Sequence, residues 1–247
     1  MPQNYIEYFI KTPDKVKIAL NHYKKNKDEI LIIAAGWTMS KNSLFIQEIA
    51  KDFSEEFDVI SFDFRGHGKS SGLYTFTVEE QKDLKTIIDY AKKDYKKVYL
   101  IGFSLGGAIS IIYNSTGNNV DNLIIVSAPH SFETIKHFGW LKDFIKNPFN
   151  KYEIKQWIKL RISPLIKKKV KPIEVVDKIK IPTLFIAGES DNIIPPEDTK
   201  KLFEKAACKK HFKLFENCNH AEDLIYQNKK DLLSTSIKWF KENIATE

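Results

Sequence analysis

The chain has 247 residues, a length typical of one α/β domain and sufficient for a sizeable hydrophobic core. Its 43% hydrophobic and 29% charged residues are typical of a globular protein, and no apolar run approaches the roughly 20 residues that a membrane span requires. The net charge of +7 comes mostly from scattered lysines without interleaved aromatic residues, so we expect no nucleic-acid partner and no stable membrane insertion.

The N-terminal residues lack the basic and apolar regions of a signal peptide. The two cysteines, Cys208 and Cys218, are too few for a disulfide framework and fit a reducing compartment. These features predict a cytoplasmic protein. The densest basic cluster, Lys167-Lys168-Lys169 with Lys171, is interpreted as a solvated surface, with attraction of an anionic substrate or a membrane surface as the alternative.

The first third of the chain begins with strands and then alternates strands with helices. Apolar and polar residues alternate over 5–10 and 16–23 around a Thr-Pro-Asp-Lys turn signal, which predicts an antiparallel hairpin at a sheet edge. Further apolar runs predict two buried strands, and periodic apolar residues predict helices. The strands are expected over 29–35 and 58–62, and the helices over 43–53 and 77–93. Thr77 and Glu80 have the spacing of a capping box that opens the second helix.

The alternation continues to the C-terminus. Strands are expected over 98–101, 122–127, 183–187 and 212–215, and helices over 105–113, 196–206 and 224–243. Apolar strands that alternate with amphipathic helices predict an α/β fold, in which helices cover both faces of a mostly parallel sheet. In such sheets, ligands and working groups lie at the carboxyl ends of the strands.

One interval interrupts this alternation of strands and helices. Residues 129–182 are too many for a single crossover loop, and they contain their own aromatic and aliphatic residues. We therefore predict an inserted helical cap at 129–182, punctuated by Pro148, Pro164 and Pro172, with the core formed by 1–128 and 183–247.

The most informative stretch is Gly102-Phe-Ser-Leu-Gly106, which lies between a predicted strand and a predicted helix. A G-x-S-x-G sequence in this context is typical of a nucleophile elbow, in which a strained turn lifts the serine hydroxyl clear of the sheet. The two glycines let the strand and the helix pass close together. Ser104 is therefore the predicted nucleophile.

A serine hydroxyl needs a base to take its proton, and the base needs a third group to orient it. His220 follows the last predicted strand, and Asp191 follows the strand before it. The chain order Ser104, Asp191, His220 is the order expected for this type of elbow. Glu189 is the rival acid, because it lies closer to the strand end, and Asp63 is a weaker rival.

With these motifs the chain resembles the α/β-hydrolases, within the serine-hydrolase group that includes small bacterial carboxylesterases, monoacylglycerol-lipase-like enzymes and serine aminopeptidase-like members. The resemblance covers nearly the whole chain and rests on Gly102-Phe-Ser-Leu-Gly-Gly107, Asp63-Phe-Arg-Gly-His-Gly-Lys-Ser70, Ala187-Gly-Glu-Ser-Asp191 followed by Pro195, and Asn219-His220. Serine at position 104 separates the chain from the family branches that use an aspartate or a cysteine nucleophile. The motifs are specific for the α/β-hydrolase fold and the triad but not for a substrate.

The resemblance also implies an oxyanion hole formed by the backbone N–H groups of Leu105 and Trp37. The loop that carries Trp37 usually reads His-Gly in this family, whereas Ala35 precedes Gly36 here. Gly36 and Trp37 are further expected to contact substrate. In the Asp63–Ser70 motif, Asp63, Arg65 and His67 are expected to hold this loop and the elbow together by hydrogen bonds; they are not expected to be catalytic.

We therefore predict a serine esterase that cleaves a small-molecule carboxylic ester through an acyl-enzyme on Ser104, without a metal ion or an organic cofactor. The cap aromatics Phe138, Trp140 and Trp157 are candidates for the substrate pocket or for the cap's own core. Alternatives on the same triad are a thioesterase, a monoacylglycerol lipase and an amidase or peptidase. A non-catalytic ligand-binding protein of the same fold is the alternative from another class. The sequence fixes neither the acyl-chain length nor the oligomeric state.

Overall fold

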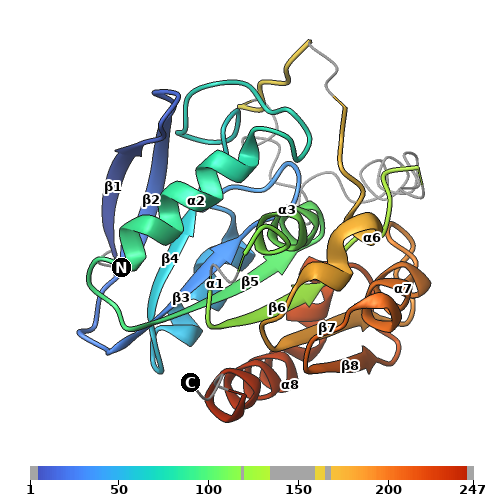
Figure 1. The fold of residues 1–247 in the computed structure, drawn as a ribbon. Coiled ribbons are helices and arrows are strands. Elements are labelled where there is room, and N and C mark those ends of the chain that lie inside the picture. Colours follow the sequence, from blue (N-terminus) through green and yellow to red (C-terminus); the bar gives the residue numbers. More distant parts are fainter. Residues whose placement is uncertain (1–4, 118–119, 134–158, 165–167, 244–247) are drawn as a thin grey trace.

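The computed structural model describes residues 5–117, 120–133, 159–164 and 168–243 (Figure 1). Eight strands in these ranges form one sheet in the order β1-β2-β4-β3-β5-β6-β7-β8. They are β1 (Ile6–Lys11), β2 (Lys17–Tyr23), β3 (Glu29–Ala34), β4 (Asp58–Phe62), β5 (Lys97–Phe103), β6 (Asn122–Val126), β7 (Thr183–Gly188) and β8 (Lys210–Phe215). The β1–β2 and β2–β4 pairs are antiparallel, and the other neighbouring pairs are parallel. The predicted edge hairpin and mostly parallel sheet are confirmed.

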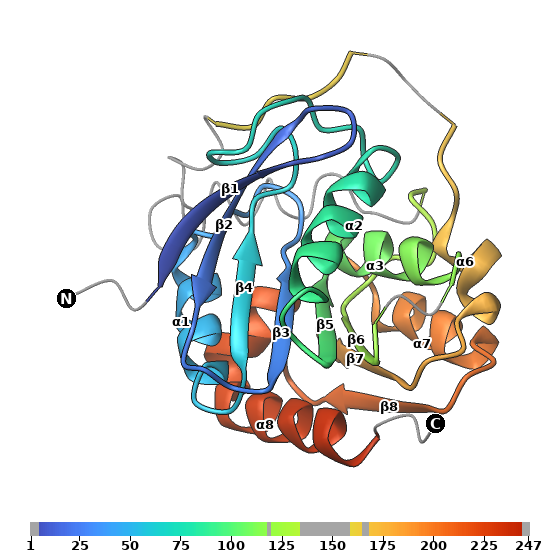
Figure 2. The same cartoon turned by 60° about the vertical axis from the view of Figure 1, so that its left-hand side comes forward.

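Helices cover both faces of this sheet (Figures 1 and 2). They are α1 (Leu44–Phe53), α2 (Glu80–Ala91), α3 (Leu105–Asn114), α6 (Pro172–Val175), α7 (Pro196–Lys205) and α8 (Ala221–Glu242). Buried apolar residues of α2, α3, α6 and α7 join one core cluster, and those of α1 and α8 join another. The central strands are buried on both faces because each face packs against one of these clusters, as their near-continuous apolar sequences predict. Although α8 spans 22 residues, no helix in the described ranges is long and apolar enough to cross a lipid bilayer.

One local prediction is wrong. The helix expected from Thr77 begins at Glu80, because Phe76 and Thr77 have left-handed φ values of 54° and 83° and turn the chain before it becomes helical. The Glu80 carboxylate accepts hydrogen bonds from the backbone N–H of Thr75, at 2.7 Å, and from its hydroxyl, at 2.8 Å. Glu80 therefore stabilises the preceding loop and does not complete a capping box with Thr77.

About half of the predicted cap range, 134–158 and 165–167, lies outside the described residues. Its described parts are 129–133, 159–164 and 168–182. The segment 159–164 is joined to the loop after β4, where Ile162 and Tyr74 form an isolated parallel bridge. The backbone N–H groups of Tyr74 and Ser163 donate to Arg161 and Tyr74, respectively, each at 2.8 Å. Further along, Val176 and Ile179 are buried in the same core cluster as α3. These described segments are therefore attached to the body of the fold before β7 begins.

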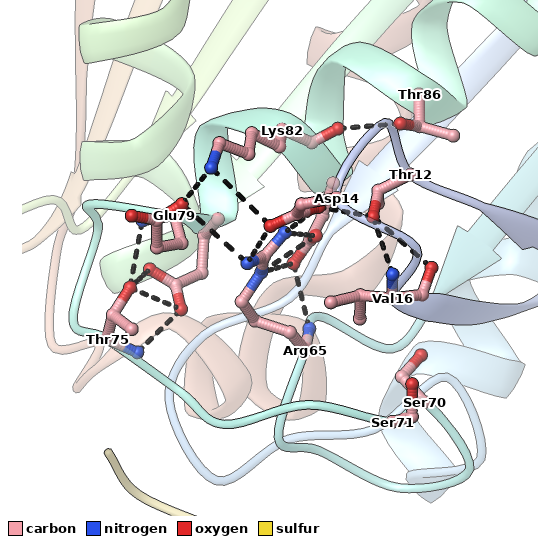
Figure 3. A network of polar contacts seen from close by, with 12 residues as sticks. Thr12, Asp14, Val16, Arg65, Ser70, Ser71, Thr75, Glu79, Lys82 and Thr86 are labelled. Carbon is pink, nitrogen blue, oxygen red and sulfur yellow. Dashed lines mark hydrogen bonds and ion pairs between the residues drawn. The ribbon is translucent and has the colours of Figure 1, made fainter. Parts of the chain in front are cut away.

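A buried ion-pair network holds the loop between β4 and α2 (Figure 3). The Arg65 guanidinium is only 4% exposed and donates from Nη2 and Nε to Asp83 of α2, at 2.7 and 3.0 Å. It also donates from Nη1 to Asp14 in the β1–β2 turn, at 2.9 Å. Because the Asp83 side chain is fully buried, either charge without its partner would be strongly unfavourable. Arg65 thus joins the hairpin, the loop and α2.

This network predicts a large loss of stability when Asp83 is removed. In Asp83→Ala, the Arg65 charge stays buried without its main partner, so the free energy of unfolding should fall by about 3–5 kcal/mol. Chemical denaturation measures this change. The control is Lys85→Ala, which breaks an ion pair with Asp89 in which both side chains are more than half exposed. That variant should change stability by less than about 1 kcal/mol; equal effects of the two variants would contradict a structural role for the buried pair.

Candidate active site

Ser104 occupies a strained turn between β5 and α3. Its φ of 51° and ψ of −121° lie outside the regions that L-residues favour, a strain that is typically about 1–3 kcal/mol. The turn is tight enough that a Cβ atom at Gly106 would lie 2.2 Å from the carbonyl oxygen of Ala34, and a Cβ at Gly102 would lie 2.8 Å from the Cα of Gly107. The steric reason given above for both glycines therefore holds in the structure.

Two chain segments that could bind a negative charge adjoin this turn. Leu105 is the first residue of α3, and N–H groups in the first turn of a helix have no acceptor within the helix and carry partial positive charge. On the other side lies the β3–α1 loop, residues 35–43. A Cβ atom at Gly36 would be 3.1 Å from the Cβ of Ser104, so this loop touches the serine directly and Trp37 follows the contact.

Asp191 and His220 meet between the loops that follow β7 and β8. His220 Nδ1 lies 2.7 Å from Asp191 Oδ2, and both residues are buried. Because the carboxylate only accepts, Nδ1 carries the hydrogen and Nε2 is left as the basic nitrogen. Asp191 Oδ1 also accepts the backbone N–H groups of Ile193 and Ile194, at 3.0 and 2.9 Å. The carboxylate shapes its own turn and orients the histidine at the same time.

The electrostatic environment of His220 favours its protonated form. Burial alone would lower the pKa of the ring, but the charge and hydrogen bond of Asp191, together with Glu222 and Asp223, raise this pKa to about 9. Both acids lie in the first turn of α8, and burial raises the pKa of the Glu222 carboxyl. Sequence reasoning missed these two carboxyl groups, although their position directly after a candidate histidine was a usable signal.

Ser104 lies at the same edge of the sheet as the Asp191–His220 pair, since β5, β7 and β8 run parallel. Within the described residues, however, the Ser104 hydroxyl makes no hydrogen bond to His220. The structure thus brings the acid and the histidine together, and it places the serine at the same edge of the sheet without a hydrogen bond to the histidine. Such bonds are often long in unliganded enzymes and tighten when substrate binds.

The rival acids have other partners. Glu189 is exposed, and its carboxylate accepts the backbone N–H of Asn217 at 3.0 Å. Asp63 is fully buried and accepts the Ser40 hydroxyl and the Lys41 N–H, each at 2.8 Å. Neither contacts His220, so the geometry favours Asp191.

The expectation that Asp63, Arg65 and His67 tie their loop to the elbow is corrected. Their hydrogen bonds run to the β3–α1 loop, the β1–β2 turn and α2; among the described residues none reaches 102–107. The physical reason is that the β3–α1 loop itself lies between them and the serine. It contacts Ser104 through Gly36 and is bonded to His67 through the N–H of Thr38.

Phe76 is a neighbour of the site that sequence reasoning missed. Its ring lies 5.7 Å from that of Trp37, centroid to centroid, and the Lys169 ammonium lies 4.6 Å from the Phe76 centroid. Lys171 is paired with Glu133 at 2.8 Å. Lys167 and the predicted pocket residues Phe138, Trp140 and Trp157 lie outside the described residues. In the described part of the chain, no group of three or more His, Cys, Asp or Glu side chains is placed to hold a metal ion.

Comparisons with known proteins agree with the fold described above. A family model described as the alpha/beta hydrolase fold matches residues 29–144, and one described as serine aminopeptidase S33 matches residues 164–222. The esterase Pf2001 of Pyrococcus furiosus superposes with a TM-score of 0.80 at 23% identity, with 98% of this chain and 93% of that chain covered.

Sequence comparison also finds relatives of this chain. The chain is 26% identical to the uncharacterized protein YqkD of Bacillus subtilis, over 87% of this chain and 71% of that protein. It is 24% identical to a putative esterase/lipase of Haemophilus influenzae, over 96% and 94%. It spans only about half the length of two further relatives, from Arabidopsis thaliana and Schizosaccharomyces pombe. The sheet order, the strained serine turn, the two family matches and the superposition together show that this chain has the α/β-hydrolase fold.

Proposed function

We propose that the protein is a serine hydrolase that cleaves carboxylic esters. The observation that carries the proposal is the buried 2.7 Å contact between His220 Nδ1 and Asp191, at the sheet edge where Ser104 sits on a strained turn. A histidine held in one tautomer by a carboxylate, beside a serine at a helix N-terminus, is the arrangement that nucleophilic acyl transfer requires. The esterase names of the structural and sequence relatives support the same reading.

In the proposed reaction, His220 Nε2 takes the Ser104 proton while the serine oxygen attacks the acyl carbon. The tetrahedral intermediate collapses when the alcohol leaves with the proton that His220 returns. Water then attacks the acyl-enzyme with the same histidine as base, and the acid product and free serine are released. Asp191 stabilises the imidazolium that forms in each half-reaction.

The negative charge that develops on the carbonyl oxygen needs hydrogen-bond donors. We assign this role to the backbone N–H groups of Leu105 and Trp37, because their segments adjoin Ser104 on two sides. The dipole of α3 adds to this stabilisation. Gly36 and Trp37 would also form the wall of the acyl pocket.

Amide or peptide hydrolysis on the same residues is the second candidate. It is supported by the serine aminopeptidase model that matches residues 164–222, the range that contains both Asp191 and His220. Esters and amides pass through similar tetrahedral intermediates, so the triad alone does not separate them.

The first prediction concerns Ser104. Wild-type protein should hydrolyse members of a p-nitrophenyl ester series, from acetate to palmitate, and Ser104→Ala should lose on the order of 10⁶-fold in kcat because the nucleophile is gone. A fluorophosphonate probe should label the wild type but not the variant. Absence of labelling and of ester hydrolysis in the wild type would contradict the proposal, whereas faster cleavage of p-nitroanilides would favour the second candidate.

The second prediction concerns pH. The neutral ring of His220 is the active base, so kcat/KM should fall as pH falls through its pKa. Because the neighbouring carboxyl groups raise this pKa to about 9, the rate should still be rising above pH 7, where an ordinary histidine is already neutral. A pH–rate profile of the wild type measures this midpoint.

The matched variants are Asp191→Asn and Glu189→Gln. The first removes the charge that raises the histidine pKa and should lower both the midpoint and kcat, the latter by about 10⁴-fold. The second removes an exposed carboxylate bonded to Asn217 and should leave the profile unchanged. A midpoint at or below 6.5 in the wild type would contradict the assignment of Asp191 as the acid. So would a larger effect of Glu189→Gln than of Asp191→Asn on the midpoint or on kcat.

A further inference from the structure

The β3–α1 loop reaches Ser104 in a conformation that needs support. Thr38 has a φ of 71°, which is unusual for a β-branched residue, and it follows directly after Trp37. The loop also lacks a side chain at position 35 that could hold it, because Ala35 carries only a methyl group. Contacts from elsewhere in the fold must therefore fix the peptide groups on either side of Trp37.

His67 supplies such a contact. The backbone N–H of Thr38 donates to His67 Nε2 at 3.3 Å, and His67 Nδ1 lies 3.2 Å from the carbonyl oxygen of Arg65. A carbonyl oxygen only accepts, so Nδ1 carries the hydrogen and Nε2 is free to accept from Thr38. The two bonds require one neutral tautomer, and burial, which lowers the pKa of His67 to about 4, keeps the ring neutral near pH 7.

The ring itself is held in place. His67 is 3% exposed, and its ring meets that of Tyr74 edge to face, with 4.6 Å between centroids and 90° between planes. Arg65, whose backbone carbonyl oxygen accepts the hydrogen bond from Nδ1, is fixed by the ion pair of its side chain with Asp83. Because the His67 side chain is held in one position, its Nε2 also holds the Thr38 N–H that donates to it in one position.

Asp63, which lies with His67 in the loop after β4, supports the other end of the β3–α1 loop. Asp63 Oδ1 accepts the Ser40 hydroxyl and the Lys41 N–H, and Asp63 Oδ2 accepts the Lys69 N–H, each at 2.8 Å. Asp63 therefore anchors the end of the β3–α1 loop that leads into α1. His67 is the anchor on the Trp37 side, next to the serine.

We infer that His67 is a positioning residue for the oxyanion hole: by accepting the Thr38 N–H it fixes the Trp37–Thr38 peptide group, so that the Trp37 N–H points to the oxygen of the bound acyl group. This inference rests on the proposed function, because it assigns His67 a role in the hydrolytic reaction. The histidine never touches substrate, and its effect passes through the backbone. The competing possibility is that His67 stabilises the fold and nothing more.

Three variants separate the two roles. His67→Phe keeps a ring against Tyr74 but removes both hydrogen bonds. His67→Gln places a carbonyl oxygen near the position of Nε2, so it restores the acceptor for Thr38, and its amide can still donate. Val98→Ala is the stability control, because Val98 is buried at the opposite, amino-terminal part of β5 and its truncation leaves a cavity far from the loop.

The measurements are steady-state kinetics on the best p-nitrophenyl ester, the denaturation midpoint, and backbone hydrogen exchange of the peptide that contains Thr38. In His67→Phe, kcat should fall by at least about 10-fold, toward the roughly 10²–10³-fold typical of a lost oxyanion donor, with little change in KM. Exchange should accelerate at Thr38 but not in α3. His67→Gln should recover most of kcat, and Val98→Ala should retain kcat despite its lower midpoint.

Two outcomes would overturn the inference. One is a wild-type kcat in His67→Phe, and the other is a loss of kcat that Val98→Ala reproduces at equal destabilisation. Both comparisons of kcat can be made only if the wild type hydrolyses the ester and Ser104→Ala does not. If that rate is absent, the proposed function fails instead, and the hydrogen exchange at Thr38 still reports whether His67 holds the loop.

Discussion

The backbone of Ser104 is the constraint on which the rest of the site depends. One residue turns the chain from β5 into α3, and the turn brings the helix against the carbonyl oxygens at the end of β3. Strain of this kind persists only where the surroundings overdetermine it. Here the surroundings are a buried parallel sheet: the N–H of Ser104 is bonded to the carbonyl of Val126 at 2.8 Å, and both faces of β5 are covered. The loops that follow β3, β7 and β8 are arranged around this fixed point.

Single residues in these loops make several structural contacts at once. Asp191 uses one oxygen to close its own turn and the other to hold His220. Arg65 balances the buried charge of Asp83 and, through its carbonyl oxygen, sets the tautomer of His67. Because a buried polar group must be paired, each of these bonds limits the choices of the next. The result is a connected set of contacts that extends from the β1–β2 hairpin to the edge of the serine turn.

Local pattern was enough to predict the strands, the helices of the described core and the parallel sheet, because burial on two faces leaves a strong apolar signal. It also pointed to Ser104, Asp191 and His220 through their positions after strands. It failed at Thr77 and Glu80, where two left-handed residues override the capping signal. The partners of His67 could not be predicted, since Thr38 is 29 residues away and offers only a main-chain N–H, which has no signature in the sequence.

The contact between the β3–α1 loop and Ser104 is made by main chain, and this has an evolutionary consequence. Selection on such a loop acts on backbone geometry, so the side chains at positions 35 and 37 can drift while the geometry persists. Sequence comparison, which scores side chains, then understates how much backbone geometry two proteins of this fold share. Divergence of these loop side chains beside an unchanged serine turn would let proteins of this fold change what they bind without rebuilding the fold.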